Sequence, residues 1–398
     1  MNLFNKKKNT QRVFLDYAST TPIDKKVLEA MGPFYIEKFF NPSSIYKEGV
    51  EIKNILKDTK ESVARILHAR KTDIYFTGSG TEANNLAILG LFKKYKKEDF
   101  VPHFIFSNIE HPSILEVAKE IEKQGGEFTL VEVNEEGLIN PQDILAAIKE
   151  NTVLVSVMYA NSEIGTVQNI PQISRLVKKY KTGAGRNFSD YPFIHTDASQ
   201  APNYLDINCE RLGVDMMTLD GSKIYGPKGI GCLYKKHSVG LEPIIFGGGQ
   251  EEGLRSGTEN ISNIIGFTKA LEIAVGMREK ESERLKELRD YFIDQILEKI
   301  PNASLNGSKE HRLPNNTNVC IPGINAEFEV IRLDEKGIAC AYTTACKTLG
   351  DESKSYVVEA LGKMDCAGSS LRFTFGRHTT KKDIDLTLQK IGDNFLGK

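Results

Sequence analysis

The chain has 398 residues, 40% of them hydrophobic and 26% charged, which is the composition of a folded globular protein and not of a disordered one. Its 52 Lys and Arg residues balance 53 Asp and Glu residues, so charge gives no case for direct binding of nucleic acid or of an acidic membrane. No apolar run approaches membrane-spanning length, and Lys6-Lys7-Lys8 leads into polar residues instead of the apolar core of a secretory leader. We therefore expect a cytoplasmic location.

From about residue 20 to 265, short apolar runs alternate with amphipathic segments. Helical spacing over 143–149, for example, is followed by the apolar run 153–158 and then by helical spacing over 171–181. This alternation predicts an α/β fold in which helices flank a largely parallel sheet. We assign residues 20–265 to a large domain of this kind.

Residues 269–300 are rich in Glu, Lys, Arg and Leu and predict one long helix. We expect this helix to lead into a smaller α+β domain, formed by residues 1–19 together with residues 266–398.

The six cysteines stand at positions 209, 232, 320, 340, 346 and 366, with no C-x-x-C pair. This spacing does not match a zinc or iron–sulfur motif, so we expect no metal site. A chain of this length also does not need disulfide bonds to support its core.

Lys223 lies between Thr218 and Gly231, where a strand-like apolar run breaks into a glycine-rich turn. A lysine amine at the end of a buried strand loses hydration, gives up its proton more readily and can condense with an aldehyde. The aldehyde that suits it is pyridoxal 5'-phosphate (PLP). The alternative, a solvated surface charge, is the usual state of a lysine.

A second motif is the strand-like Ile74-Tyr75-Phe76, followed by a Gly/Ser/Thr turn and a helix that starts near Gly80 and Thr81. Such a turn presents free N–H groups and the positive end of a helix dipole to an anion. It predicts a phosphate-binding cup, although many turns of this kind only cap a helix.

Two further strand ends carry polar residues. Asp197 follows an apolar run and could keep a pyridine nitrogen protonated, with Gln200 contacting a ring hydroxyl, or it could cap a helix. His111 precedes Pro112, a residue suited to a first helical turn, and could stack on a cofactor ring or serve only as a cap.

Together these segments resemble the cysteine desulfurase family, PLP enzymes of the class V aminotransferase type and of fold-type I, whose large domain holds a mostly parallel seven-stranded sheet. The matching segments follow one another in the family's order: Phe14 to Pro22, Asn41 to Ser44, Gly80 to Asn85, Glu110-His111, Asn161 to Gly165, Asp197 to Gln200, Lys223 to Gly229, Gly247 to Glu251, Arg255 to Thr258, Ser370 to Phe373 and Gly376-Arg377.

The resemblance implies a role for each matching residue. Lys223 would form the Schiff base with PLP and, with His111, move protons. The other cofactor contacts would be Gly80, Thr81, His111, Asp197 and Gln200, with Thr258 reaching the neighbouring subunit of a homodimer. We also expect Ser222, which does not match the family, to contact the phosphate. Asn161 and Arg372 would bind the substrate carboxylate, and the planar fork of an arginine suits that group.

The resemblance also implies the reaction, in which L-cysteine becomes L-alanine and its sulfur forms a persulfide on Cys346. The persulfide would pass to an acceptor protein of iron–sulfur cluster assembly or of a tRNA-thiolation relay. Cys346 lies in a polar stretch and Cys340 in an apolar one, so we expect Cys340 to be an inert core residue. The small domain would thus carry Cys346 and Arg372.

The chain departs from the family where phosphate is held, because Asp220-Gly221-Ser222-Lys223 replaces the common Ser-Gly-His-Lys. Either the Asp220 carboxylate turns away to accept backbone N–H groups and Ser222 donates to phosphate, or PLP is held loosely. Tyr342-Thr343-Thr344, Glu252 and a polar insertion at 182–191 are further departures. Two alternatives stay open: a PLP enzyme acting on selenocysteine or another amino acid, and a weakened, non-catalytic subunit of a sulfur-transfer assembly.

Overall fold

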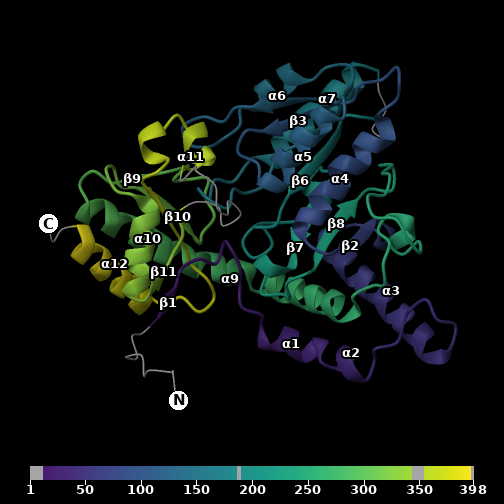
Figure 1. Cartoon of the computed structure of the whole chain (residues 1–398), viewed down its shortest axis with the longest axis horizontal. Coiled ribbons are helices and arrows are strands. Elements are labelled where there is room, and N and C mark those ends of the chain that lie inside the picture. Colours follow the sequence, from purple (N-terminus) through teal and green to yellow (C-terminus); the bar gives the residue numbers. More distant parts are fainter. Residues whose placement is uncertain (1–11, 186–189, 343–353, 396–398) are drawn as a thin grey trace, which may run out of the picture.

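A sheet of seven strands forms the centre of the larger lobe in the computed structural model, which describes residues 12–185, 190–342 and 354–395 (Figure 1). The strand order is β2-β8-β7-β6-β5-β3-β4. β8 runs antiparallel to both neighbours, and every other pairing is parallel. The strands are β2 (Ile74–Thr77), β3 (His103–Ser107), β4 (Glu127–Val131), β5 (Thr152–Ser156), β6 (Phe193–Asp197), β7 (Met216–Asp220) and β8 (Gly231–Lys235). The predicted α/β fold with a mostly parallel seven-stranded sheet is confirmed.

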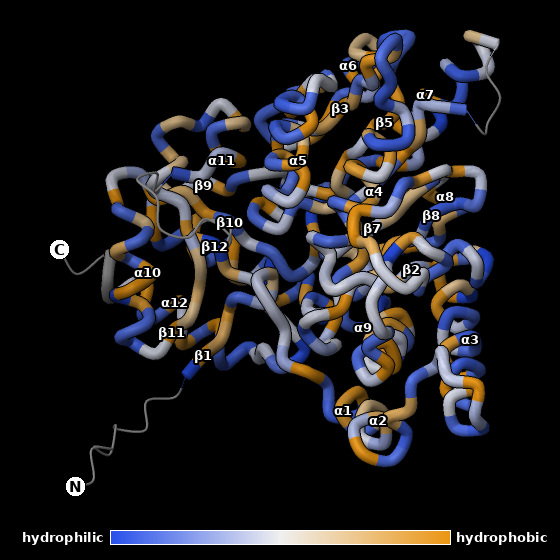
Figure 2. The backbone as a smooth tube through the Cα atoms, turned by 45° about the vertical axis from the view of Figure 1, so that its right-hand side comes forward, coloured by the Kyte–Doolittle hydropathy of each residue, from blue (hydrophilic) through white to orange (hydrophobic). Residues whose placement is uncertain are grey.

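Helices cover both faces of this sheet because its strands are apolar on both sides. Along β3, Phe104 and Phe106 face a core shared with two helices, and Ile105 faces the opposite core. On the first side lie α4 (Gly80–Tyr95) and α5 (Pro112–Lys123). The other elements of this lobe are α1 (Lys25–Met31), α2 (Pro33–Ile36), α3 (Lys47–Leu67), α6 (Pro141–Ala147), α7 (Ile170–Gly183) and α8 (Cys209–Leu212). Figure 2 shows the hydrophobic strands inside and the mixed character of surface helices such as α3.

A second core lies in the smaller lobe. It surrounds an antiparallel sheet of order β12-β10-β9 and a parallel pair, β1 with β11. The ring of Phe292 packs edge-on against Phe373 and Phe375, at centroid distances of 5.0 and 5.5 Å. The elements are β1 (Val13–Phe14), β9 (Ser304–Leu305), β10 (Asn316–Cys320), β11 (Ile338–Ala339), β12 (Ser370–Thr374), α10 (Ala326–Glu335), α11 (Tyr356–Ala360) and α12 (Lys381–Phe395).

One long helix, α9 (Ile261–Lys299), connects the two cores. Its residues from Ile264 to Ala274 pack in the large core, and those from Leu285 to Ile296 pack in the small one. The predicted helix at 269–300 therefore starts eight residues earlier than expected. The proposed boundary at 265/266 falls inside its first turns, and the boundary itself stays a prediction.

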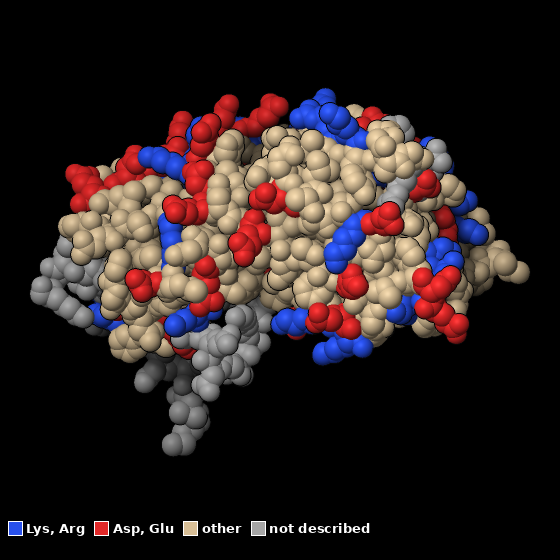
Figure 3. All heavy atoms as spheres, turned by 90° about the horizontal axis from the view of Figure 1, so that it is seen from above, with Lys and Arg blue, Asp and Glu red and all other residues tan. Residues whose placement is uncertain are grey.

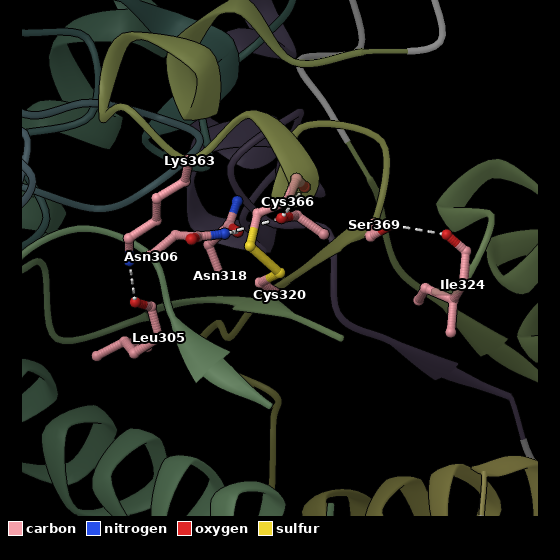
Figure 4. The surroundings of a disulfide bond; sticks show 9 residues. Leu305, Asn306, Asn318, Cys320, Ile324, Lys363, Cys366 and Ser369 are labelled. Atoms are coloured by element: carbon pink, nitrogen blue, oxygen red, sulfur yellow. Dashed lines mark hydrogen bonds between the residues drawn. A yellow bond between two sulfur atoms is a disulfide. The ribbon is translucent and has the colours of Figure 1, made fainter. Parts of the chain in front are cut away.

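The described residues contain one disulfide bond, which was not expected from the sequence. Cys320 at the end of β10 is disulfide-bonded to Cys366, the last residue of the 3-10 turn Met364–Cys366 (Figure 4). The bond ties this turn to the sheet that carries β12, and Ser370 on β12 donates its hydroxyl to the Cys366 carbonyl at 2.6 Å. Cys340 is buried as predicted, and burial raises the pKa of its thiol to about 12.

None of the helices in the described part of the chain has the length and apolar character needed to span a bilayer. Within the same residues, no three or more His, Cys, Asp or Glu side chains are grouped as a metal site. On the face drawn in Figure 3, acidic and basic side chains are interspersed, in keeping with the near-zero net charge.

Candidate active site

A pocket opens at the carboxyl ends of the parallel strands, where open α/β sheets bind ligands. Its walls come from the turns after β2, β3, β5, β6 and β7, together with one strand of the small sheet, β12. Eight of the residues predicted from sequence line it: Gly80, Thr81, His111, Asp197, Gln200, Ser222, Lys223 and Arg372.

Lys223 ends the 3-10 turn Gly221–Lys223 that follows β7. Its Nζ donates to the backbone oxygen of Ser19, and Asn203 holds the Lys223 carbonyl at 2.8 Å. Lys228 lies five residues further on, donates to the Thr21 carbonyl at 3.2 Å and does not line the pocket. The structure therefore separates the two lysines of this segment.

Asp197 ends β6 with its side chain almost buried, only 8% exposed. Its two oxygens accept from the Ser199 N–H at 2.9 Å and from Asn84 Nδ2 at 2.8 Å. Among the described residues Asp197 forms no ion pair. The neighbouring His195 does not supply a positive charge, because burial lowers the pKa of its imidazole to about 4, against the effect of the Asp197 charge, and the ring is neutral at pH 7. A buried carboxylate held only by neutral donors suits a cationic ring nitrogen.

His111 is the N-cap of α5. Its Nδ1 accepts the Ser113 N–H at 3.1 Å, which leaves Nε2 as the nitrogen that carries the proton in the neutral ring. Gln200 is fixed from the other side, because its Nε2 donates to the Ala18 carbonyl at 2.9 Å. Both side chains are thus oriented by local contacts around the pocket.

Arg372 on β12 has the largest fully buried side chain in the described part of the chain, with 1% of the residue exposed. Its Nη2 donates to Asp16 at 2.7 Å and to Ser19 at 2.8 Å, and its Nη1 donates to the Ser162 carbonyl at 3.1 Å. Its buried Nε has no hydrogen-bond partner among the residues that the structure describes. Arg372 lines the pocket, and a guanidinium that still has an unpartnered donor is suited to an incoming carboxylate.

Three predicted residues are not brought to this pocket by the described chain. Asn161 is buried and holds its own loop, since its Oδ1 accepts the N–H groups of Glu163 and Ile164 at 2.9 and 3.0 Å. Thr258 is exposed and lines a different hollow. Cys346 lies outside the described residues. Their roles stay predictions.

Three residues that organise the site were not assigned a role from the sequence. Ser19 contacts both Lys223 and Arg372, Asp16 neutralises Arg372, and Asn84 orients Asp197. All three lie inside segments that carry the family resemblance, and this position was the feature of the sequence that could have identified them as site residues.

Comparison with known proteins agrees with this geometry. The sequence model of the family described as Aminotransferase class-V matches residues 13–387. A cysteine desulfurase IscS from Dictyoglomus turgidum is 40% identical over 379 residues, which cover 95% of this chain and 93% of that protein. A cysteine desulfurase IscS 1 from Archaeoglobus fulgidus is also 40% identical over 379 residues, covering 94% and 95%.

Two solved structures share the architecture. A NifS-like protein is 30% identical with a TM-score of 0.89, covering 98% of this chain and all (100%) of that one. The protein SspA, solved in complex with cysteine, is 32% identical with a TM-score of 0.78, covering 93% and 100%. With matches over nearly its whole length, the chain belongs to the class V aminotransferase family and, within it, to the PLP-dependent cysteine desulfurases.

Proposed function

We propose that the protein is a PLP-dependent cysteine desulfurase, which converts L-cysteine to L-alanine and passes the sulfur to Cys346 as a persulfide. The observation that carries this proposal is the meeting of Lys223, His111, the buried Asp197 and Arg372 in one pocket; among the described residues, the buried Nε of Arg372 has no hydrogen-bond partner. A catalytic amine, a proton carrier, a ring-binding carboxylate and a carboxylate receptor are the groups that this chemistry needs.

The residues fit the cofactor. Asp197 would hold a proton at the pyridine nitrogen, Gln200 would contact the ring hydroxyl and His111 would stack on the ring. Gly80 and Thr81 in the first turn of α4, with Ser222 after β7, would receive the phosphate; in the structure, the Gly80 N–H and the Ser222 hydroxyl donate to Asp220. When bound, PLP acts as an electron sink for the substrate carbon next to its nitrogen. The protein must supply the proton transfers and the sulfur acceptor.

Lys223 Nζ would transfer protons to and from the substrate carbons, and His111 Nε2 would exchange the proton of the substrate thiol. Arg372 would orient the substrate through its carboxylate, and Asn161 would add a contact if its loop rearranged. Arg372→Lys removes the fork but keeps the charge, so we expect KM for L-cysteine to rise roughly tenfold or more while PLP binding is unchanged.

The sulfur step needs a thiol that attacks the substrate sulfur, so that the carbon–sulfur bond breaks, a sulfur–sulfur bond forms on the enzyme and the substrate carbon takes up a proton. Burial raises the pKa of the Cys340 thiol to about 12, which leaves almost no thiolate at neutral pH. This supports Cys346 as the carrier. The persulfide would then pass to an acceptor protein of iron–sulfur assembly or of tRNA thiolation, in the cytoplasm.

We also propose a homodimer. Thr258 is exposed and lines a hollow other than the pocket of its own chain, which is compatible with a contact to a neighbouring subunit. Large apolar side chains are exposed at Ile36, Phe39, Ile45 and Phe246, with 64 to 97% of their surface accessible. A second copy of the chain that covered them would remove this apolar surface from water.

The test is to purify the protein, record its visible spectrum with and without added PLP, and measure alanine and sulfide made from L-cysteine in the presence of a reductant. Absorbance of bound PLP with equal amounts of alanine and sulfide is expected. Selenocysteine as a parallel substrate distinguishes the related selenium activity. A colourless protein that PLP does not reconstitute would favour the weakened, non-catalytic subunit, the candidate that the carboxylate of Asp220 near the phosphate cup supports.

A further inference from the structure

The phosphate cup contains an acid of its own. Asp220 ends β7, and its Oδ2 accepts the N–H of Gly80 at the start of α4 at 2.9 Å. Its Oδ1 accepts both the N–H and the hydroxyl of Ser222, at 2.7 and 2.5 Å. A helix-start N–H and a nearby hydroxyl are the donors that a phosphate group would use. The Asp220 carboxylate therefore occupies part of the anion site.

The position of this carboxylate is fixed by packing as well as by hydrogen bonds. An ideal Cβ on Gly80 would lie 3.0 Å from Asp220 Oδ2 and 3.1 Å from Asp220 Cβ, so the two residues are in direct contact. Asp220 also caps the 3-10 turn that leads to Lys223. The carboxylate accepts backbone N–H groups, as the first of the two alternatives has it, but it does so while lining the pocket, and the Ser222 hydroxyl donates to it. How tightly PLP is held stays a prediction.

The charged groups around the cup come from several elements. Glu82, on the first turn of α4, is paired with Arg255 at 2.8 Å. The other titratable groups lining the pocket are Lys223 after β7, Asp197 at the end of β6, His111 before α5, and Arg372 on β12, which is paired with Asp16. Under the proposed function Lys223 binds the aldehyde of PLP and Asp197 contacts its ring nitrogen. Neither residue is therefore assigned to the phosphate.

An ionised carboxylate and a phosphate dianion are both acceptors without a donor, and they repel each other at contact distance. A phosphate ester loses its second proton at pH ~6. If that proton is kept, it can lie between the two groups in a short, charge-assisted O–H···O⁻ hydrogen bond. The charge conflict is then removed without moving Asp220.

We propose that Asp220 makes the cup selective for a phosphate group that brings a proton, so that PLP binds with one proton shared between its phosphate and the Asp220 carboxylate. The inference rests on the proposed function, because it concerns the phosphate of the same cofactor. It names Asp220 as a specificity residue for the ionisation state of the ligand.

The consequence is a pH dependence of cofactor affinity that belongs to Asp220. Binding that requires one extra proton weakens about tenfold for each pH unit above the second ionisation of the phosphate. Asp220→Asn removes the negative charge while keeping the size of the side chain, and Asp220→Ser restores the hydroxyl common in the family. Neither variant should need the shared proton.

The experiment titrates the apoprotein and both variants with PLP at several values between pH ~6 and ~8.5, following absorbance and protein fluorescence. The ratio of the wild-type Kd to the variant Kd cancels the pH dependence of the bond to Lys223, which all three proteins share. We expect this ratio to rise by about tenfold per pH unit. A ratio that is the same at every pH overturns the proposal.

Pyridoxal, which lacks the phosphate, is the matched control, and its ratio should not change with pH. A rising ratio with pyridoxal would also overturn the proposal, since the effect would not come from phosphate. If neither variant folds, the wild type is tested by competition. Inorganic phosphate should displace PLP at least tenfold better than sulfate, which has no proton to share, and equal displacement by the two anions would overturn the proposal. Failure of every protein to bind PLP would overturn the proposed function and this inference with it, whereas PLP binding with a constant ratio overturns only the inference.

Discussion

The side chain of Asn84 donates to the carboxylate of Asp197 across 113 residues of sequence, at 2.8 Å. Asn84 lies in the second turn of α4, the helix whose first turn forms the phosphate cup, and Asp197 ends β6. The same Nδ2 lies 2.9 Å from the hydroxyl of Ser113, the residue that orients His111. One buried amide thus sets the position of the ring-binding carboxylate relative to the phosphate site and the ring-stacking histidine.

Replacing Asn84 by Ala should weaken PLP binding. The substitution removes a donor to a buried carboxylate, a loss of ~1.5 to 3 kcal/mol, which corresponds to a Kd for PLP raised about tenfold or more. Spectroscopic titration of the apoprotein measures it. Asn85→Ala is the neighbouring control, because Asn85 donates to the carbonyls of Thr81 and Ser113 and not to Asp197, and it should leave the Kd within about threefold. Equal Kd values for the two variants would contradict the assigned role.

Lys223→Ala should abolish the visible absorbance of the cofactor bound through its aldehyde, since Lys223 is the lysine that lines the pocket. Lys228→Ala should keep that absorbance, because the Lys228 amine contacts the Thr21 carbonyl outside the pocket. Spectra of both purified variants, recorded after addition of PLP, make the comparison. The opposite pattern would mean that the wrong lysine had been assigned.

The elements that place the site were predictable because each is encoded locally. An apolar run followed by Gly, Ser or Thr and then by helical spacing predicts a strand, a turn and a helix, and β2 with α4 forms in that way. Parallel strands bring such turns to one edge, which is why Gly80, His111, Asp197 and Lys223 meet.

Contacts between distant segments were not predictable in the same way. Asp220 reaches Gly80 across 140 residues, and Arg372 reaches Asp16 across 356. The Cys320–Cys366 bond spans 46 residues and depends on the turn after α11 folding back on β10. Such pairings depend on the approach of elements in three dimensions, and neither composition nor periodicity records it.

The two neighbouring thiols should behave differently. Cys346→Ser should retain PLP absorbance and lose alanine formation, whereas Cys340→Ser should keep most activity, because burial raises the pKa of the Cys340 thiol to about 12 and leaves it unreactive. Mass spectrometry of the wild type after brief exposure to L-cysteine should locate the extra sulfur on the peptide with Cys346. Finding it on Cys340 would reverse the assignment.

The carboxyl of Glu110 should make stability depend on pH. Burial raises its pKa from the ordinary value of 4.5 to about 8, against the hydrogen bonds from Ser107 and from the Met158 N–H. Between these two values the folded protein holds a proton that the unfolded chain has lost. The stability contribution of this group therefore falls as pH rises from 4.5 to about 8, by up to roughly 1.4 kcal/mol for each pH unit.

Glu110→Gln removes the titration, since the amide stays neutral at every pH. We expect its melting temperature, followed by circular dichroism, to fall less than that of the wild type as pH is raised through this interval. Glu116→Gln is the same substitution at an exposed position of α5, where Glu116 pairs with Lys119 at 2.7 Å. It should keep the wild-type slope because exposed pairs contribute little. If the wild type and Glu110→Gln lost stability in parallel, the proton held by the folded protein would have to lie on another group.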